Sequence, residues 1–398
     1  MRVAFFQRIF AHYQAGLMKA LTASSRHTYT FYGENRDPLS SGIEPVSEEV
    51  RRMLPYTICR TRHWGRHCAF QWRAVARALY GPDDVLILEG GLTILTNWPA
   101  MIAARLRGKR VLLYTHGWLR RESGIRKFAK NTFYRMAHAL LLYSPRARAI
   151  GESYGFDPRR LFVVYNSLDD ETILQYRQNL TGMMRQEFRR EWLGAKSDLP
   201  MVVSVGRLNA AKEYPLLLEA AALLNKRGLA VTIMLVGEGP ERPILAEQAM
   251  ELGVTLVLPG ARYDEQFLSR AISSASLMVI PGAAGLSVIH SLSYGTPVVV
   301  HDDDDEQGPE VEAVKEGVNG ARFRRGSVDD LARAMRAVLE ELPKTPEVEA
   351  LCRTVVDEAY SPRRMAEVFD CAVSGMPADH PHAEAEHQGA EAAAVLGS

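Results

Sequence analysis

The sequence predicts an α/β protein made of two doubly wound domains, each with a parallel sheet. Short apolar runs alternate with longer amphipathic segments along most of the 398 residues. The apolar runs read as strands buried on both faces, as in sheets covered by helices. A charged stretch without a strand separates the two alternating halves. With 47% hydrophobic and 24% charged residues, the chain can bury a core in each half.

The alternation is clearest in residues 201–345, which we expect to form the second domain. Its first helix, at 214–227, has Leu217, Leu218, Ala221 and Leu224 spaced along one face. Strands are expected at 201–205, 231–236, 254–258, 277–280 and 297–300. Further helices are expected at 241–252, 265–274 and 286–294.

Residues 1–180 repeat the pattern more loosely and form a second Rossmann-like domain in this interpretation. Strands are expected at 2–6, 85–88, 110–114, 140–143 and 162–164, and helices at 95–107 and 124–137. Residues 181–200 are the expected linker, because 197–200 break a charged helical stretch. The last helices, at 346–374, are expected to return to the first domain. Residues 375–398, rich in Ala, Glu and His, are expected to be a disordered tail.

The composition narrows the function classes. A formal net charge of +1 gives no general attraction to nucleic acid or to an anionic bilayer. The four cysteines show no C-x-x-C pair, which argues against a zinc site or a disulfide framework: Cys59, Cys68, Cys352 and Cys371. No apolar run approaches the ~18 residues of a spanning helix, and the start of the chain does not resemble a signal peptide. We therefore expect a cytoplasmic protein.

The loop after the first strand of the second domain carries the first binding candidates. Gly206 permits a tight turn, and Arg207 and Lys212 place a planar fork and a point charge near one helix N-terminus. This combination suits a diphosphate, although an ordinary basic surface loop is the alternative. Ligands bind at such carboxyl ends of strands in doubly wound sheets.

A second loop consists of small residues and follows the strand at 277–280. Backbone amides in such a loop can approach a ligand closely, and the following helix adds its free N–H groups. The residues concerned are Gly282, Ala283, Ala284, Gly285, Leu286 and Ser287. Tight packing alone would also explain the glycines. His290, one turn into the helix, is a candidate ligand contact or simply a packed histidine.

These motifs resemble the family-four retaining glycosyltransferases of the type that builds bacterial surface polysaccharides. The resemblance rests on the order of G-R-L-x-x-x-K at 206–212, G-x-G at 237–239, the Pro-Gly-x-x-Gly-Leu turn at 281–286 and Y-G-T-P-V-V at 294–299. Gly308-Pro309-Glu310 and G-V-N-G at 317–320 follow. In the first half, Y-T-H-G-W at 114–118 and V-Y-N-S-L-D at 164–169 are similar too.

The resemblance implies the GT-B fold, in which two Rossmann-like domains face each other across a cleft. Residues 1–180 would then be the acceptor-binding domain, and residues 201–345 would be the nucleotide-sugar-binding domain. The resemblance also implies a hexosyltransferase-like enzyme that moves a sugar from a nucleotide diphosphate donor to a glycan or lipid-linked acceptor. Arg207 and Lys212 would then bind the diphosphate, and His116 would lie near the transferred sugar. Gly16 would sit in an N-terminal loop facing the phosphates. No metal or other cofactor is implied.

One departure from the family pattern affects the site. The family usually has two glutamates eight positions apart, for the donor sugar and the ribose; here Gly282 and His290 occupy those positions. Glu310 and Glu312 are the nearest carboxylates left to replace them, unless they are only a surface pair. A catalytically silent relative that binds nucleotide or glycan stays open, as does a sugar-nucleotide epimerase. A nicotinamide dehydrogenase is disfavoured, because no G-x-G-x-x-G follows the first strand.

Two further segments invite interpretation. The acidic run 302–305 could chelate a cation, but an exposed loop of solvated carboxylates is the favoured hypothesis, so no metal site is predicted. Residues 118–135 combine six basic residues with several aromatics, and such a segment can lie on an anionic membrane. A solvated basic face is the alternative. Peripheral contact with the inner face of a membrane would fit a lipid-linked acceptor.

Overall fold

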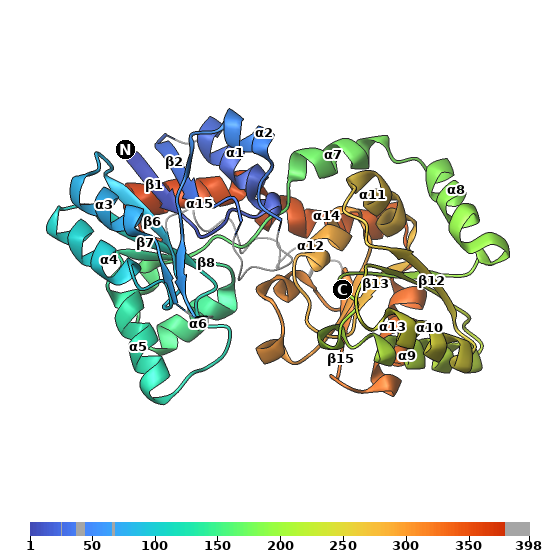
Figure 1. The fold of residues 1–398 in the computed structure, drawn as a ribbon. Helices are drawn as coiled ribbons and strands as arrows, with labels where there is room; N and C mark the ends of the chain where they lie inside the picture. Colours follow the sequence, from blue (N-terminus) through green and yellow to red (C-terminus); the bar gives the residue numbers. More distant parts are fainter. Residues whose placement is uncertain (25, 37–43, 66–67, 379–398) are drawn as a thin grey trace, which may run out of the picture. The chain divides into compact units, whose positions relative to one another are not determined.

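Two parallel sheets organise the chain, each within its own unit. The structure, a computed structural model, describes residues 1–24, 26–36, 44–65 and 68–378. The N-terminal unit comprises 1–169 and the residues from 359 onward, and the C-terminal unit comprises 170–358 (Figure 1). The N-terminal unit is therefore discontinuous in sequence.

The N-terminal sheet has seven parallel strands in the order β3-β2-β1-β6-β7-β8-β9. Its strands are β1 (Arg2–Phe6), β2 (Thr28–Gly33), β3 (Tyr56–Ile58), β6 (Val85–Glu89), β7 (Arg110–Thr115), β8 (Ala139–Leu142) and β9 (Leu161–Val163). Its helices are α1 (Ala15–Ser24), α2 (Glu48–Met53), α3 (Trp72–Tyr80), α4 (Asn97–Leu106), α5 (Gly124–Arg135), α6 (Pro145–Ser153) and α15 (Pro362–Ser374). A separate antiparallel hairpin joins β4 (Arg62–Trp64) to β5 (Cys68–Phe70).

Helices cover both faces of this sheet, as the buried apolar strands require. Alternate strand residues such as Phe5 pack on α1 and α15, and the intervening residues, such as Phe6, pack with α3, α4 and α6. Phe5 and Phe369 of α15 lie 5.7 Å apart between ring centroids. Figure 1 shows α15, the red helix, alongside the blue strands of the N-terminal unit.

The C-terminal sheet has six parallel strands in the order β12-β11-β10-β13-β14-β15. Its strands are β10 (Met201–Val205), β11 (Thr232–Val236), β12 (Thr255–Gly260), β13 (Leu277–Ile280), β14 (Val298–His301) and β15 (Gly320–Phe323). Its helices are α7 (Asp170–Asn179), α8 (Gly182–Leu193), α9 (Tyr214–Lys226), α10 (Arg242–Leu252), α11 (Glu265–Ser274), α12 (Ser287–Ser293), α13 (Val328–Glu341) and α14 (Pro346–Ala359). Helices α9, α10 and α13 cover one face, and α11 and α12 lie on the other.

Every strand expected in the two halves is present within a residue or two, and the doubly wound α/β class is confirmed. The domain limits need correction. Residues 181–200 are not a linker, because α8 packs on α11 within the C-terminal unit. Arg189 fixes α8 there by donating to the carbonyls of Ser197, Ser274 and Leu199 at 2.7, 3.0 and 2.5 Å. The unit boundary lies instead between Asp169 and Asp170.

The end of the chain also differs from the expected division. Of the residues expected to return to the first domain, α14 belongs to the C-terminal unit up to Glu358, and α15 belongs to the N-terminal unit. Residues 375–378 are not part of a tail: Ala378 is buried, and its N–H donates to the Arg159 carbonyl at 3.0 Å. The remainder of the expected tail, 379–398, lies outside the described residues.

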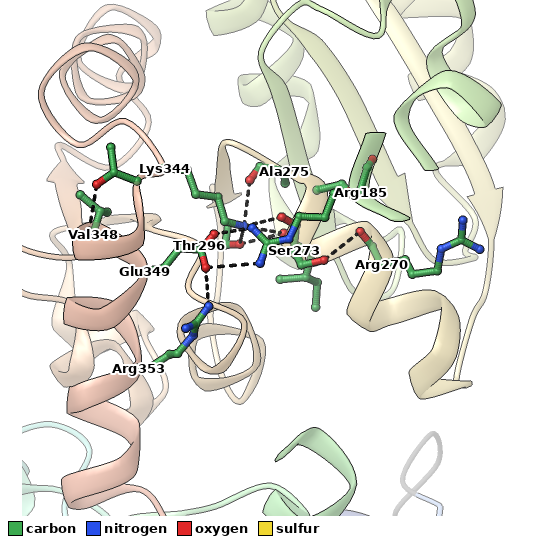
Figure 2. A network of polar contacts seen from close by, with 12 residues as sticks. Arg185, Arg270, Ser273, Ala275, Thr296, Lys344, Val348, Glu349 and Arg353 are labelled. Atoms are coloured by element: carbon green, nitrogen blue, oxygen red, sulfur yellow. Dashed lines mark hydrogen bonds and ion pairs between the residues drawn. The ribbon is translucent and has the colours of Figure 1, made fainter. Parts of the chain in front are cut away.

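A polar network fixes α14 within the C-terminal unit (Figure 2). The Lys344 amine donates to the Ser273 and Ala275 carbonyls, at 2.7 and 3.2 Å, and to the Thr296 hydroxyl at 2.5 Å. It thereby supplies donors for the carbonyls at the end of α11, which lack partners within the helix. Glu349 of α14 pairs with Arg185 of α8 and with Arg353. Burial lowers the pKa of the Lys344 amine to about 7.

Candidate functional site

The loops after β10 and β13 meet at the carboxyl edge of the C-terminal sheet. These strands are neighbours, and the chain leaves β10 toward β11 on one side and reaches β13 on the other. That point is the topological switch, where doubly wound sheets bind ligands. The Ala283 N–H donates to the Ala211 carbonyl at 3.0 Å, and the Lys212 amine donates to the Ala283 carbonyl. The two loops predicted from the sequence are thus one structure.

Lys212 and Arg207 occupy different environments in this site. Lys212 is partly buried, and burial lowers the pKa of its amine. Its ammonium has three donors, so the bond to Ala283 leaves others for a ligand. Arg207 is exposed, and its guanidinium forms no ion pair with any part of the chain that the structure describes. The site therefore offers a ligand two positive charges: one on the hydrogen-bonded Lys212 and one on the exposed Arg207.

The neighbouring G-x-G segment, 237–239, passes so close to the backbone of residues 206–208 that only glycine fits at its two ends. A Cβ atom at Gly237 would lie 1.9 Å from the Gly206 carbonyl oxygen, and one at Gly239 would lie 2.1 Å from that of Leu208. The Leu208 N–H donates to the Glu238 carbonyl at 3.0 Å. Both glycines thus support the loop that carries Arg207.

The segment after β14 also contacts the small-residue loop, through hydrogen bonds to Ala284. The buried Gln307 side chain accepts a hydrogen bond from the Ala284 N–H at 2.7 Å, and the Gly308 N–H donates to the Ala284 carbonyl at 3.0 Å. A Cβ atom at Gly308 would lie 2.8 Å from a carboxylate oxygen of Glu310. Glu310 is buried beside this loop, whereas Glu312 is half-buried. Helix α12 begins at Ser287, slightly after the expected Gly285–Leu286 start.

His290 has a carboxylate partner that no local sequence pattern indicates. Its Nε2 lies 2.8 Å from the Glu265 carboxylate, at the start of α11. The Tyr294 hydroxyl donates to the same oxygen at 2.5 Å. Burial opposes the charge of Glu265, but His290 and Tyr294 outweigh it, so the pKa of this carboxyl is lowered. His290 thus belongs to a charged cluster between α11 and α12.

Two carboxylates of the acidic run after β14 pair with arginines. Asp303 pairs with Arg325 at 3.1 Å, and Asp304 pairs with Arg322 at 2.7 Å. Hydrogen bonding to Arg325 lowers the pKa of Asp303. No group of three or more His, Cys, Asp or Glu side chains suited to a metal ion occurs among the described residues.

The N-terminal unit contributes His116 at the carboxyl end of β7. Its exposed ring packs on Tyr143 with centroids 4.2 Å apart. Gly16 is not in a loop, as expected, but in the first turn of α1, where it is buried. A Cβ atom there would lie 2.9 Å from Pro362 and 3.3 Å from the Asp169 backbone. Close packing within this unit accounts for Gly16. The expected loop placement is therefore wrong, whereas a contact of Gly16 with the phosphates stays a prediction.

Two family models match the chain, one on each half. The model described as "Glycosyltransferase Family 4" matches residues 12–172, and "Glycosyl transferases group 1" matches residues 199–341. The chain belongs to the family-four glycosyltransferases. The predicted resemblance is therefore confirmed.

Individual relatives of this glycosyltransferase agree with that assignment. The D-inositol 3-phosphate glycosyltransferase of Nocardia farcinica is 32% identical over 207 residues, which cover 48% of this chain and 43% of the relative. The alpha-D-kanosaminyltransferase of Streptomyces kanamyceticus is 26% identical over 223 residues, covering 54% and 55%. The chain thus spans about half the length of the curated relatives it matches.

Solved structures show the fold of the whole glycosyltransferase. The structure of Anabaena HepE in complex with UDP matches with a TM-score of 0.71 at 17% identity. The match covers 94% of this chain and 100% of the HepE chain. The lipopolysaccharide outer core galactosyltransferase WaaB has a TM-score of 0.66 at 14% identity, covering 94% and 99%. The predicted GT-B fold is confirmed.

The departure at Gly282 has a steric cause in this glycosyltransferase. A Cβ atom at Gly282 would lie 2.3 Å from the Ala211 carbonyl oxygen and 2.9 Å from the Lys212 Cα. No side chain fits while the two loops stay together, so the family's first glutamate is excluded here. Sequence reasoning identified the loop residues but missed Gln307 and Glu265. Their partners lie 23 and 25 residues away, on other elements, and no local pattern marks them.

Proposed function

We propose that this glycosyltransferase moves a glycosyl group from a nucleotide diphosphate sugar to a glycan or lipid-linked acceptor, with retention of anomeric configuration. The observation that carries the proposal is the junction of the β10 and β13 loops at the switch point, with Lys212 and Arg207 beside it. Family membership supports the reaction class. The relatives named as glycosyltransferases support it as well.

In the proposed reaction, the bond from the anomeric carbon to the diphosphate oxygen breaks and a bond to the acceptor oxygen forms. The acceptor proton passes to the departing phosphate, so the step needs no enzymatic nucleophile. Negative charge grows on the diphosphate as its bond lengthens, and fixed cations at that position lower the barrier. Arg207 and Lys212 take this role. His116 stays the predicted contact near the transferred sugar.

In this proposal, the cluster of Glu265, His290 and Tyr294 between α11 and α12 binds the ribose of the nucleotide. Glu265 already engages the Nε2 atom of His290, which leaves Nδ1 for a ribose hydroxyl. Glu310, buried beside Ala284 and Gly308, is the carboxylate placed to replace the missing glutamate of the donor-sugar contact. The backbone N–H groups of residues 282–287 would donate hydrogen bonds to the nucleotide diphosphate sugar.

A donor panel tests the proposal. Purified protein is incubated with UDP-, GDP- and ADP-sugars, and release of nucleotide diphosphate is followed with and without acceptor extracts. We expect one nucleotide to support turnover and Arg207→Ala to remove it. Binding of a nucleotide without turnover would favour the silent relative, and interconversion of the donor sugar would favour the epimerase.

We propose that the reaction uses no metal or other cofactor. Arg325 and Arg322 already pair with Asp303 and Asp304 of the acidic run. In this proposal, Arg207 and Lys212 balance the negative charge of the diphosphate. These side chains supply the positive charge that a divalent cation supplies elsewhere.

We further propose a cytoplasmic placement with peripheral contact at the inner face of a membrane. Leu119, Ile125 and Phe128 are 43%, 88% and 73% exposed at the start of α5, and Arg120 and Arg126 are exposed among them. Such a surface can insert apolar groups and attract anionic lipid.

Two other basic residues of this segment, Lys127 and Lys130, contact the N-terminal unit itself. Lys127 lies 3.9 Å from the Tyr154 ring centroid, and Lys130 pairs with Glu122 at 3.0 Å. Across the described part of the chain, no helix is both long and apolar enough to cross a bilayer. Cosedimentation with phosphatidylglycerol vesicles should fall in an Ile125→Asp, Phe128→Asp variant, while Tyr80→Ala, at another exposed site, should bind as wild type. Equal binding by all three proteins would exclude this contact.

A further inference from the structure

The β4–β5 hairpin of the N-terminal unit carries two aromatic side chains on one face, the exposed Trp64 and the half-buried Phe70. Arg62 is paired with Phe70 and Trp64 with Cys68, so these four side chains share a face. Ala69 points to the other face and is buried. We name Trp64, Phe70 and Trp72 the aromatic platform.

The platform is open to a ligand. Trp64 and Trp72 are 75% and 59% exposed, large fractions for a residue type that is highly buried on average. The rings of Phe70 and Trp72 stack, with centroids 6.3 Å apart and planes at 16°. Exposed ring faces held at fixed angles are typical of binding surfaces, because they contact a partner with little loss of side-chain entropy.

Hydrogen bonds tie the platform to the switch point of the N-terminal sheet. Ala69 donates to the Thr93 carbonyl at 2.8 Å and accepts from the Leu95 N–H at 2.9 Å. The Gln71 amide donates to the Gln7 carbonyl at 3.0 Å. Gln7 follows β1 and Thr93 follows β6, and these adjacent strands flank the point where the strand order reverses. Loops at such a point are where a doubly wound sheet holds its ligand.

Three arginines lie on the segments that carry the rings or adjoin them in sequence. Arg60, Arg62 and Arg73 are all exposed, and Arg73 donates to the Ile58 carbonyl at the end of β3. The nearby carboxylate of Glu34 is occupied by the Thr61 N–H, at 2.5 Å. A guanidinium fork matches a carboxylate or phosphate, and a flat ring face matches the apolar face of a sugar ring.

We propose that the aromatic platform binds an anionic glycan, and that this glycan is the acceptor. Its sugar rings pack on Trp64 and Trp72, and its carboxylate or phosphate groups pair with Arg60 and Arg62. The inference rests on the proposed glycosyl transfer and adds the chemical class of the acceptor. Attachment to the switch-point loops favours a substrate over a lipid surface, since those loops position whatever binds beside the sheet.

Titration calorimetry with defined oligosaccharides tests the platform. The probes are a galacturonate hexamer and, as the uncharged control, maltohexaose. We expect the galacturonate to bind more tightly than maltohexaose, and Trp64→Ala and Trp72→Ala each to weaken it about tenfold. Trp72→Phe should restore most of the affinity, because a ring face remains. Tyr80→Ala, at the far end of α3 and 86% exposed, is the matched control and should bind as wild type.

Several outcomes would overturn the proposal. Equal affinity for the two hexasaccharides removes the anionic class, and unchanged affinity in both alanine variants removes the platform. Loss of phosphatidylglycerol-vesicle binding in these variants, with glycan affinity intact, would make the surface a lipid contact instead. Nucleotide diphosphate is titrated into each protein as well. Wild type that binds nucleotide but no glycan refutes this inference alone, whereas wild type that binds no nucleotide refutes the proposed donor site.

Discussion

The substitution Gly282→Ala isolates the contact between the β10 and β13 loops. It adds one methyl group at a position where a Cβ atom would lie 2.3 Å from the Ala211 carbonyl oxygen and 2.7 Å from the Lys212 carbonyl carbon. Ordinary contacts need about 3.3 Å or more, so the loops must separate by about 1 Å. The movement breaks the bond from Ala283 to Ala211 and draws the Lys212 amine away from Ala283.

The expected effect has a structural and a catalytic part. Overpacking of this kind costs about 1–3 kcal/mol, and each kcal/mol lowers Tm by about 2–4 °C in a domain of this size. A displacement of about 1 Å in a positioning group costs about 100-fold in rate. We therefore expect Gly282→Ala to melt several degrees early and to lose about 100-fold in turnover.

Calorimetric melting and nucleotide diphosphate release measure the two parts. Gly182→Ala is the matched control, because nothing lies within 4 Å of a Cβ atom at Gly182, at the start of α8. It should keep both the Tm and the turnover of wild type. A Gly282→Ala protein with wild-type turnover would refute the reasoning, since the loops would then not need their present spacing.

Four further outcomes are expected. Lys212→Ala and Arg207→Ala should each lower turnover by about 100-fold or more with little change in Tm, the scale for losing a charge donor at a developing anion; near wild-type rates in folded variants would contradict the donor site. Turnover should survive excess chelator, and a complete loss that Mg²⁺ or Mn²⁺ restores would identify a metal requirement. His290→Ala should weaken nucleotide diphosphate binding severalfold by calorimetry, about 1 kcal/mol, and Glu265→Gln should do so less because it keeps a hydrogen-bond partner; unchanged affinity would return His290 to a packing role. Lys344→Met should reduce the free energy of unfolding by about 1–3 kcal/mol, because the carbonyls at the end of α11 lose their donor, and denaturant titration with an unchanged midpoint would show that water replaces the amine.

The parallel strands were predictable because they are continuous apolar runs. Two of the strands that were not predicted lack this signal: β2 reads TYTFYG, with aromatic and polar residues alternating, and β15 is only four residues and begins with Gly320. They become strands because β1 and β14 supply hydrogen-bonding edges beside them. Whether these segments form strands thus depends on pairing with residues distant in sequence, and this pairing is not visible in a short stretch of sequence.

The same limit applies to the site. The glycines and basic residues of the two loops lie close together in sequence, and their chemistry could be read locally. The α8 helix was interpreted as a linker because its sequence is charged, yet Arg185 and Arg189 use that charge to bind α14 and α11. Glu265 gained its role only through contact with α12. In a sequence, a charged residue that pairs with another helix or strand thus looks the same as one that faces solvent.

The return of the chain through α15 determines the order in which the molecule can be completed during synthesis. Residues 170–358 form a whole unit inserted into the other one, and every contact that this unit requires is available before α15 has been translated. The N-terminal unit begins first but waits for Met365, Phe369 and Val373 to close its core. One face of its nascent sheet is therefore covered by α1 but not by α15 while the inserted unit is being made, and a chaperone that binds apolar surfaces would find its target on the uncovered part of that face. A chain that ends before residue 360 would contain the complete C-terminal unit and an N-terminal unit whose core is still incomplete.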